Sequence, residues 1–235
     1  MKFIKAKSYE ELSRLAANFI CAQVVLKPNS VIGLATGSTP IGTYAKMAEK
    51  NKAGDVDFSQ MRTINLDEYV GLEPTHDQSY RYFMNKNLFN NINIDINNTY
   101  VPNGVAADIA KECEAYDARI AEFGLDIQLL GIGVDGHIGF NEPDTYFEKA
   151  THQVTLDPST IEANARFFES ADDVPRTAIT MGMGGIMSAK KILFIANGKN
   201  KKDIVEKAFF GPITPAVPAS ILQLHPDVTV IYTEE

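Results

Sequence analysis

The densest group of reactive side chains lies in a glycine-containing segment near the middle of the chain. Residues 129–143 read LLGIGVDGHIGFNEP, which combines an apolar strand end with two carboxylates, a histidine and an asparagine. Ligands of open α/β sheets bind at strand ends, and glycine lets the backbone approach a ligand closely. We therefore expect Asp135, His137 and Glu142 to form one acid/base cluster.

The same segment contains a pattern typical of dinucleotide-binding loops, from Gly131 through Gly133 to Gly136, with Asp157 about twenty residues further on. Such a loop must open directly into a helix whose N-terminus binds the pyrophosphate. Pro143 falls inside the second turn of that hypothetical helix, where proline is disruptive. We therefore expect no dinucleotide here. A glycine turn beside a solvated acidic patch is the competing, unreactive interpretation.

A second loop, GLATGSTP at residues 33–40, joins a predicted strand to a predicted helix and is suited to bind an anion. Free backbone N–H groups and the positive end of the helix dipole attract negative charge, and the hydroxyls of Ser38 and Thr39 add donors. Gly37 is followed by Ser-Thr, so the lysine of a P-loop is missing. The loop favours a phosphate monoester over a nucleoside triphosphate, although an ordinary capped turn has a similar sequence.

Two adjacent carboxylates, Asp67 and Glu68, follow an apolar strand pattern. Side chains alternate along a strand, so only one of the two can face a crevice. If Asp67 faces it, a carboxylate half-shielded from water is a suitable base for a proton on carbon beside a carbonyl. Taken alone, the pair would be interpreted as surface carboxylates.

Two basic residues are candidates to complete a phosphate site. Arg166 is a lone guanidinium before an aromatic pair, and Lys201 lies where a predicted strand turns into the start of a helix. Considered singly, each is interpreted more simply as a solvated charge.

The elements that position these residues follow from capping signals and apolar periodicity. Ser8 and Glu11 form a capping-box pattern that predicts a helix to about Leu26. Thr39 as N-cap and Pro40 at the first helical position predict a second helix. Strand-like runs occur at 31–36, 63–66, 127–130, 152–156, 177–181, 192–196 and 228–232, and the clearest helical patterns at 79–89, 106–123 and 200–210. This alternation predicts βαβ units and an α/β fold with a mainly parallel sheet covered on both faces.

Length and composition are those of an ordinary globular protein. The chain has 235 residues, of which 45% are hydrophobic and 22% charged, and we expect one domain spanning 1–235. The net charge of -8 disfavours non-specific binding to nucleic acid or to an anionic membrane.

Cysteine usage and apolar runs indicate the cellular context. Cys21 and Cys113 lie among apolar neighbours without metal-ligand or C-x-x-C spacing, so we expect reduced core residues. The chain shows neither a signal-peptide pattern nor an apolar run of about eighteen residues. We expect a cytoplasmic protein.

Six segments together resemble the glucosamine-6-phosphate deaminase (isomerase) family: GLATGSTP, NLDEYVGL, GVDGHIGFNEP, NARFF, GKNKK and LQLHP. The resemblance covers essentially the whole chain. DGHIGFNEP and LDEYVGL are specific, whereas the phosphate loop is shared more widely with sugar-phosphate relatives. The family implies a modified doubly wound, Rossmann-like fold. It also implies conversion of glucosamine 6-phosphate and water to fructose 6-phosphate and ammonia, without a metal or organic cofactor.

The resemblance also implies residue roles at the matching positions. His137 would open the pyranose ring as general acid/base, oriented by Asp135 and Glu142. Asp67 would remove the C2 proton of the open-chain sugar and pass it to C1. The substrate phosphate would be held by Gly37, Ser38, Thr39, Arg166 and Lys201.

The chain departs from longer relatives that carry an extra carboxy-terminal segment and respond allosterically to an acetylated sugar phosphate. It stops at Glu235, and residues 150–154 read ATHQV where those relatives place basic effector ligands. We therefore expect a monomer without an allosteric effector site.

Two rival functions use part of the same residue set. A phosphogluconolactonase would share the D-G-H loop and the phosphate site but needs no base at C2, so the Asp67 segment argues against it. A sugar-phosphate-sensing module of a transcription regulator would bring a DNA-binding extension or a basic patch, and the sequence has neither. No residue indicates whether glucosamine 6-phosphate or galactosamine 6-phosphate is the preferred substrate, or in which physiological direction the reaction runs.

Overall fold

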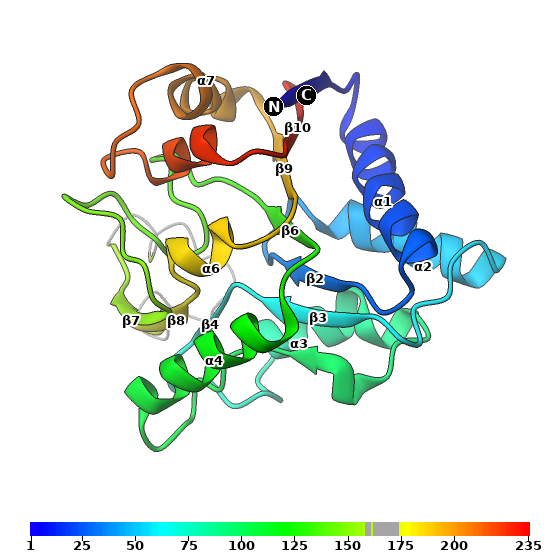
Figure 1. Cartoon of the computed structure of the whole chain (residues 1–235), viewed down its shortest axis with the longest axis horizontal. Coiled ribbons are helices and arrows are strands. Elements are labelled where there is room, and N and C mark those ends of the chain that lie inside the picture. The colour runs from blue at the N-terminus through cyan, green and yellow to red at the C-terminus, as the bar shows by residue number, and fades with distance from the viewer. Residues whose placement is uncertain (158–160, 162–173) are drawn as a thin grey trace.

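The computed structural model describes residues 1–157, 161 and 174–235. Within them, the main sheet has seven strands in the order β1-β10-β9-β6-β2-β3-β5, and neighbouring strands are parallel throughout. Figure 1 shows this sheet running through the middle of the molecule, with both chain ends close to β10. The strands are β1 Lys2–Lys5, β2 Val31–Leu34, β3 Arg62–Asn65, β5 Thr99–Tyr100, β6 Ile127–Leu130, β9 Ile192–Asn197 and β10 Val228–Thr233.

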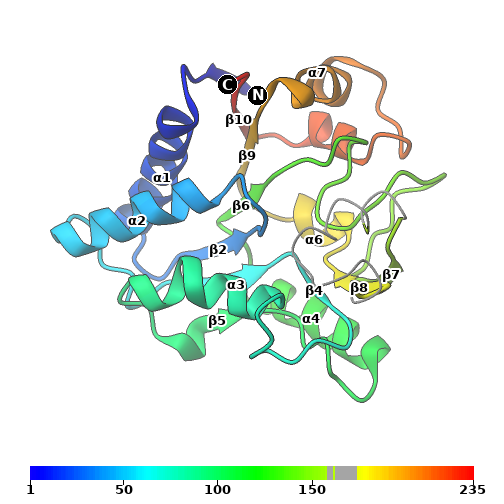
Figure 2. The ribbon, with the colours of Figure 1, turned by 180° about the vertical axis from the view of Figure 1, so that it is seen from behind.

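Helices cover both faces of the sheet, which confirms the doubly wound α/β architecture (Figures 1 and 2). One face packs against α1 Tyr9–Leu26, α2 Ile41–Ala53, α3 Tyr80–Asn87 and the short 3-10 helix η1 Phe89–Asn91. The other face packs against α4 Ile109–Phe123, α6 Met183–Met187, α7 Lys202–Phe210 and the 3-10 helix η5 Pro218–Leu224. Two more 3-10 helices, η2 Ile96–Asn98 and η4 Lys199–Lys201, lie in connections.

The two cores explain why the strands are apolar at successive positions. In β9, Phe194 belongs to the cluster beneath α4 and α7, whereas Leu193 belongs to the cluster beneath α1 and α2. Both side chains are fully buried. A parallel strand that is covered on both faces has no solvent side, so its sequence loses the alternation of a half-exposed strand.

The strand order changes direction between β2 and β6, where a crevice for ligands is expected in an open α/β sheet. In the strand order, β3 and β5 lie to one side of β2. The later strands β6, β9 and β10 lie to the other side of β2, in the same sheet. The loops after β2 and β6 therefore diverge from adjacent strands, which is where ligands bind in open α/β sheets.

A separate antiparallel sheet, β4-β8-β7, was not predicted from the sequence. It consists of β4 Asp67–Tyr69, β7 His152–Thr155 and β8 Thr177–Thr180. Only Leu66 separates β4 from β3, so the chain leaves the main sheet immediately before the two carboxylates. Register places Asp67 opposite Thr180. Pairing between segments so far apart in the sequence leaves no local signal.

Helix starts agree with the capping analysis at α1 but not at α2. Ser8 caps α1 as predicted, and its hydroxyl accepts a hydrogen bond from the N–H of Glu11. The prediction that Thr39 caps the second helix is wrong, because Pro40 occupies the N-cap position and no side chain caps that end. The hydroxyl of Thr39 instead donates to Asn197 Oδ1 at 2.7 Å, a tertiary contact that sequence spacing does not reveal.

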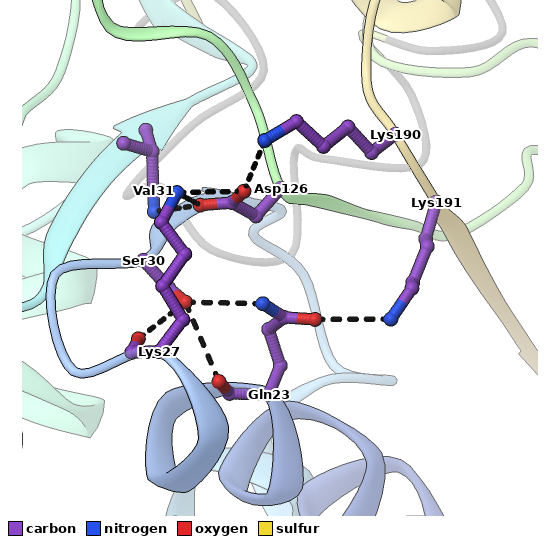
Figure 3. A network of polar contacts seen from close by, with 7 residues as sticks. All are labelled: Gln23, Lys27, Ser30, Val31, Asp126, Lys190 and Lys191. Carbon is purple, nitrogen blue, oxygen red and sulfur yellow. Dashed lines mark hydrogen bonds and ion pairs between the residues drawn. The ribbon is translucent and has the colours of Figure 1, made fainter.

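The amino-terminal ends of the central strands are held by a buried carboxylate (Figure 3). Asp126, only 2% exposed, accepts hydrogen bonds from the ammonium groups of Lys27 at 2.7 Å and Lys190 at 2.8 Å. It also accepts the backbone N–H of Val31 at 2.9 Å. These contacts join the starts of β2, β6 and β9 at the edge opposite the crevice.

Both cysteines are unpaired and buried, as predicted. Burial raises the pKa of the Cys21 thiol to about 11, which leaves it protonated at neutral pH. In the part of the chain that the structure describes, no helix has the length and apolar character needed to cross a membrane.

Candidate active site

Three loops at the carboxyl ends of β2, β6 and β9 are joined by hydrogen bonds. Thr39, after β2, donates to Asn197 at the end of β9 at 2.7 Å. Lys201 Nζ donates to the backbone carbonyl of Ile132, after β6, at 2.7 Å. The segments singled out from the sequence therefore meet at one edge of the main sheet.

The predicted cluster of Asp135, His137 and Glu142 is formed. His137 Nδ1 lies 2.9 Å from Asp135 Oδ1 and 3.2 Å from Glu142 Oε2. Asp135 Oδ1 also accepts the backbone N–H of His137 at 3.2 Å. The three side chains retain 23%, 28% and 13% exposure for His137, Asp135 and Glu142, so the cluster is shielded but accessible. Because both carboxylates lie on Nδ1, Nε2 is the ring nitrogen available to a substrate.

The carboxylates favour the charged imidazole. Burial by itself would lower the pKa of His137, but the hydrogen bonds with Asp135 and Glu142 raise it to about 9. Burial by itself would raise the pKa of Asp135, but its bond with His137 holds that pKa well below the usual range. At neutral pH the cluster therefore contains an imidazolium beside an ionised Asp135.

The glycines of this segment accommodate the histidine. A β-carbon on Gly133 would lie 2.3 to 2.5 Å from three atoms of the His137 ring, so the imidazole packs directly on the Gly133 backbone. Gly136 has a φ of 100°, a conformation that side chains rarely adopt. Residues 131–151, all described in the structure, contain no helix, and Pro143 lies outside any helix as predicted. The glycine spacing thus serves the turn around His137.

Asp67 lies beneath the same loop. The residue is 5% exposed, and its Oδ2 would be 3.5 Å from a β-carbon on Gly139, two residues after His137. Within the described residues Oδ1 has no hydrogen-bond partner. Burial and the neighbouring charge of Glu68, opposed by His137, raise the pKa of Asp67 to about 8. Asp67 is therefore a desolvated carboxylate of unusually high basicity.

The cluster also has the dimensions of a metal site. Asp135, His137 and Glu142 offer one ligand atom each, all within 4.8 Å of one another. A metal ion there would have to replace the proton on Nδ1, which both carboxylates already contact.

The phosphate-loop candidates lie on an accessible turn. Gly37 and Ser38 are exposed, Thr39 is half-buried, and Gly37 has a φ of 92°. The hydroxyl of Tyr9 lies 3.1 Å from the carbonyls of both Ser38 and Thr39.

Tyr9 was missed by the sequence analysis. Its hydroxyl also accepts the backbone N–H of Gly42 at 2.9 Å, so one side chain from α1 holds both sides of the turn that leads into α2. Tyr9 belongs to no recognisable motif, and its contacts with this turn depend on how α1 packs against α2.

Of the two basic candidates for the phosphate site, the structure describes only Lys201. Lys201 is half-buried, and burial, opposed by the charge of Asp135, lowers its pKa. Its ammonium group donates a hydrogen bond to the carbonyl of Ile132, and two further N–H donors remain on it. Arg166 lies outside the described residues.

Two further residues hold the loop that carries His137. Asn141 Nδ2 donates at 2.9 Å to the carbonyls of Ile138 and Met181. The hydroxyl of Thr180 accepts the N–H of Phe140 at 3.0 Å. The sequence analysis included the asparagine of this loop without giving it a role and missed Thr180, whose contact joins β8 to the loop.

A family model described as "Glucosamine-6-phosphate isomerases/6-phosphogluconolactonase" matches residues 6–231. The chain belongs to this family. A glucosamine-6-phosphate deaminase of Lachnoclostridium phytofermentans is 66% identical over 232 residues, which cover 98% of each chain. One of Clostridium perfringens is 56% identical over 236 residues, covering 100% of this chain and 98% of the relative. The resemblance drawn from the motifs is therefore confirmed.

Solved structures of the family share the fold. A structure described as a monomeric glucosamine-6-phosphate deaminase has a TM-score of 0.97 at 45% identity, with 99% of this chain and 97% of that chain covered. A 6-phosphogluconolactonase from Thermotoga maritima has a TM-score of 0.78 at 20% identity, covering 100% and 99% of the two chains. At that identity the likeness extends to the fold alone.

Proposed function

We propose that this chain converts glucosamine 6-phosphate and water to fructose 6-phosphate and ammonia. The observation that carries the proposal is a buried carboxylate of raised pKa, Asp67, which lies against the loop whose imidazole is held by two further carboxylates. This arrangement supplies an acid/base pair for ring opening and a separate base for carbon. High identity to relatives named as this deaminase over nearly the whole chain supports the same reaction.

His137 opens the pyranose ring in this proposal. Nε2 of the imidazolium gives a proton to the ring oxygen, and the resulting neutral nitrogen accepts the proton of the anomeric hydroxyl. Asp135 and Glu142 fix the ring orientation and keep the second proton on Nδ1.

Asp67 then acts on the open-chain aldose. It removes the C2 proton, which gives an enolamine as O1 gains a proton. It then returns the proton to C1 as the nitrogen loses one, so the amino aldose becomes a 2-imino sugar. Water adds at C2 and ammonia leaves, which makes the net change a hydrolytic loss of the C–N bond. The proposal needs no metal or organic cofactor, since its steps are proton transfers and the addition of water.

The phosphate is assigned to the exposed turn of Gly37, Ser38 and Thr39 together with Lys201 and Arg166. Support comes from free N–H groups ahead of α2 and from the two unused donors of the Lys201 ammonium group. Binding energy from the phosphate positions the reacting carbons.

We further infer that the enzyme is a single domain that acts as a monomer. The solved relative at 45% identity is described as monomeric. Residues 150–154, where allosteric relatives place basic effector ligands, contain neither arginine nor lysine.

Ammonia release tests this function directly. We expect rapid release from glucosamine 6-phosphate, very little from free glucosamine, and no hydrolysis of 6-phosphogluconolactone. Galactosamine 6-phosphate in the same panel establishes the epimer preference. Lactone hydrolysis without ammonia release would reassign the chain to the other activity of its family, and equal rates on phosphorylated and free sugar would contradict the phosphate site.

A further inference from the structure

Glu68 is a buried carboxylate to which the proposed mechanism gives no role. The residue is 2% exposed. Its Oε1 accepts the backbone N–H groups of Tyr69 at 2.8 Å and Tyr80 at 2.9 Å, and its Oε2 accepts that of Arg81 at 2.9 Å. The guanidinium of Arg81 bonds Thr99 instead, through Nη1 at 2.7 Å and Nη2 at 2.8 Å. The Glu68 carboxylate is therefore solvated mainly by backbone.

These contacts attach β4 to the first turn of α3. Tyr80 and Arg81 are the first two residues of α3, whose N–H groups have no partner inside the helix. A carboxylate at this end is also favoured by the helix dipole. Ser79 caps the same turn by accepting the N–H of Tyr82. Glu68 thus binds α3 to the strand that carries Asp67.

Through Tyr80 the attachment extends to the loop of His137. The Tyr80 ring stacks on Phe140 with centroids 5.9 Å apart, and it lies 4.8 Å from the ring of Tyr69. The two tyrosine hydroxyls are 3.4 Å apart. Phe140 lies three residues after His137. The position of β4 relative to the catalytic loop therefore depends on the turn that Glu68 holds.

Glu68 also acts on Asp67 through its charge. Adjacent residues of a strand project to opposite sides, so Glu68 reaches α3 while Asp67 reaches the loop. The charged groups that influence Asp67 are Glu68, which raises its pKa, and His137, which lowers it. The other titratable groups coupled to Asp67 are phenols with raised pKa values, those of Tyr44, Tyr69, Tyr80 and Tyr116. Because these phenols are neutral, the negative charge that strengthens Asp67 as a base is that of Glu68. Burial raises the pKa of Glu68, but its three backbone N–H donors stabilise the ionised carboxylate.

We propose that Glu68 is a positioning residue for Asp67: it fixes β4 on α3 so that Asp67 faces the His137 loop, and it places a second carboxylate beside Asp67. This inference rests on the proposed function of Asp67 as the carbon base. Glutamine would not replace Glu68, because its amide has one acceptor oxygen and would turn an N–H toward the N–H of Arg81.

The test compares the pH dependence of kcat for glucosamine 6-phosphate in the wild type, Glu68→Gln and Glu68→Asp. The acid limb of the plot of kcat against pH reports the deprotonation of Asp67. In Glu68→Gln we expect this limb to move to lower pH by about one unit, because a like charge is removed. The plateau rate of C2 proton exchange with solvent should fall by up to about tenfold, since a weaker base abstracts the proton more slowly. Glu68→Asp keeps the charge but is one methylene shorter, so its kcat should fall while the acid limb stays in place.

Glu114→Gln is the matched control, because it removes an exposed carboxylate from α4 and should leave the profile unchanged. If Glu68→Gln and the wild type share the same acid limb, the inference is overturned. Absence of ammonia release by the wild type would instead overturn the proposed function.

If the Glu68→Gln protein does not fold, a measurement on the wild type tests the same proposal. In the wild type, carbon-13 NMR of the side-chain carboxyl groups should show Glu68 ionised at every pH at which Asp67 titrates. A Glu68 carboxyl that remains protonated through the titration of Asp67 would contradict the proposal, because a neutral group cannot strengthen the base.

Discussion

Asp67 and Glu68 have the same functional group and adjacent positions, but their surroundings separate their roles. Burial raises the pKa of Glu68, but hydrogen bonds from three backbone N–H groups oppose that rise. Asp67 Oδ1 has no partner among the described side chains and backbone, and burial raises the pKa of Asp67 to about 8. An unsolvated carboxylate binds a proton tightly, and that is the property the proposed C2 base needs.

The raised pKa values of Asp67 and His137 predict a narrow pH optimum of kcat/KM. Asp67 must be deprotonated to act as a base, so kcat/KM should fall as the pH drops through about 8. His137 must be protonated to open the ring, so kcat/KM should fall as the pH rises through about 9. Initial rates at low substrate concentration, corrected for the titration of the substrate itself, give this bell-shaped profile. A profile that is level from neutral pH to well above 9 would contradict both assignments.

At the scale of elements, the His137 loop depends on a glycine beneath the ring. In Gly133→Ala the new β-carbon would lie within 2.5 Å of the imidazole, so the ring must move. A displacement of about 1 Å at a catalytic group lowers the rate by about 100-fold. We expect that loss in kcat/KM with little change in melting temperature. Gly131→Ala is the control, since no atom lies within 4 Å of its β-carbon. Equal activity in both variants would show that Gly133 does not position His137.

The buried carboxylate at the opposite edge of the sheet predicts a pH-dependent contribution to stability. Burial would raise the pKa of Asp126, but the ammonium groups of Lys190 and Lys27 lower it overall. Because the folded-state pKa is depressed, the stabilisation is present above the unfolded pKa and is lost as the pH falls through the folded value. Asp126→Asn should therefore lower the free energy of unfolding by about 2 kcal/mol at neutral pH.

Urea denaturation measures this effect, and the difference between Asp126→Asn and the wild type should shrink below about pH 4. Lys190→Met is the control, because the Lys190 side chain is 68% exposed and its loss should cost less than about 1 kcal/mol. A difference that stays constant down to acid pH would indicate that the Asp126 charge is not the stabilising feature.

Sequence patterns predicted the elements and contacts that are local in the chain. Asp135, His137 and Glu142 fall within eight residues, so one loop brings them together. The capping box at Ser8 was equally local. Long-range contacts were not predictable: Thr39 bonds Asn197 across the sheet.

The same limit applies to the second sheet. β4 pairs with β8, which lies more than a hundred residues further along the chain. The sequence around Asp67 therefore does not predict that β4 forms. Periodicity describes which face of a segment is apolar, but it does not say which partner covers that face.

At the scale of the whole molecule, we predict simple saturation kinetics. Residues 150–154 contain neither arginine nor lysine to bind an acidic effector, and an allosteric effect requires a second site with different affinity for two states. Initial rates should follow a hyperbola with or without N-acetylglucosamine 6-phosphate, and light scattering should give the mass of one chain. A sigmoidal curve that this sugar phosphate makes hyperbolic, or a hexameric mass, would contradict the prediction.

The most direct test of the central claim is the Asp67→Asn variant assayed for ammonia release and for exchange of the C2 proton with solvent. The amide keeps the shape of the side chain but cannot accept the proton, so both activities should be lost while substrate still binds with nearly unchanged affinity. Calorimetric titration with substrate measures that affinity. Near-normal ammonia release by Asp67→Asn would contradict the account, because the C2 proton would then be removed by another group.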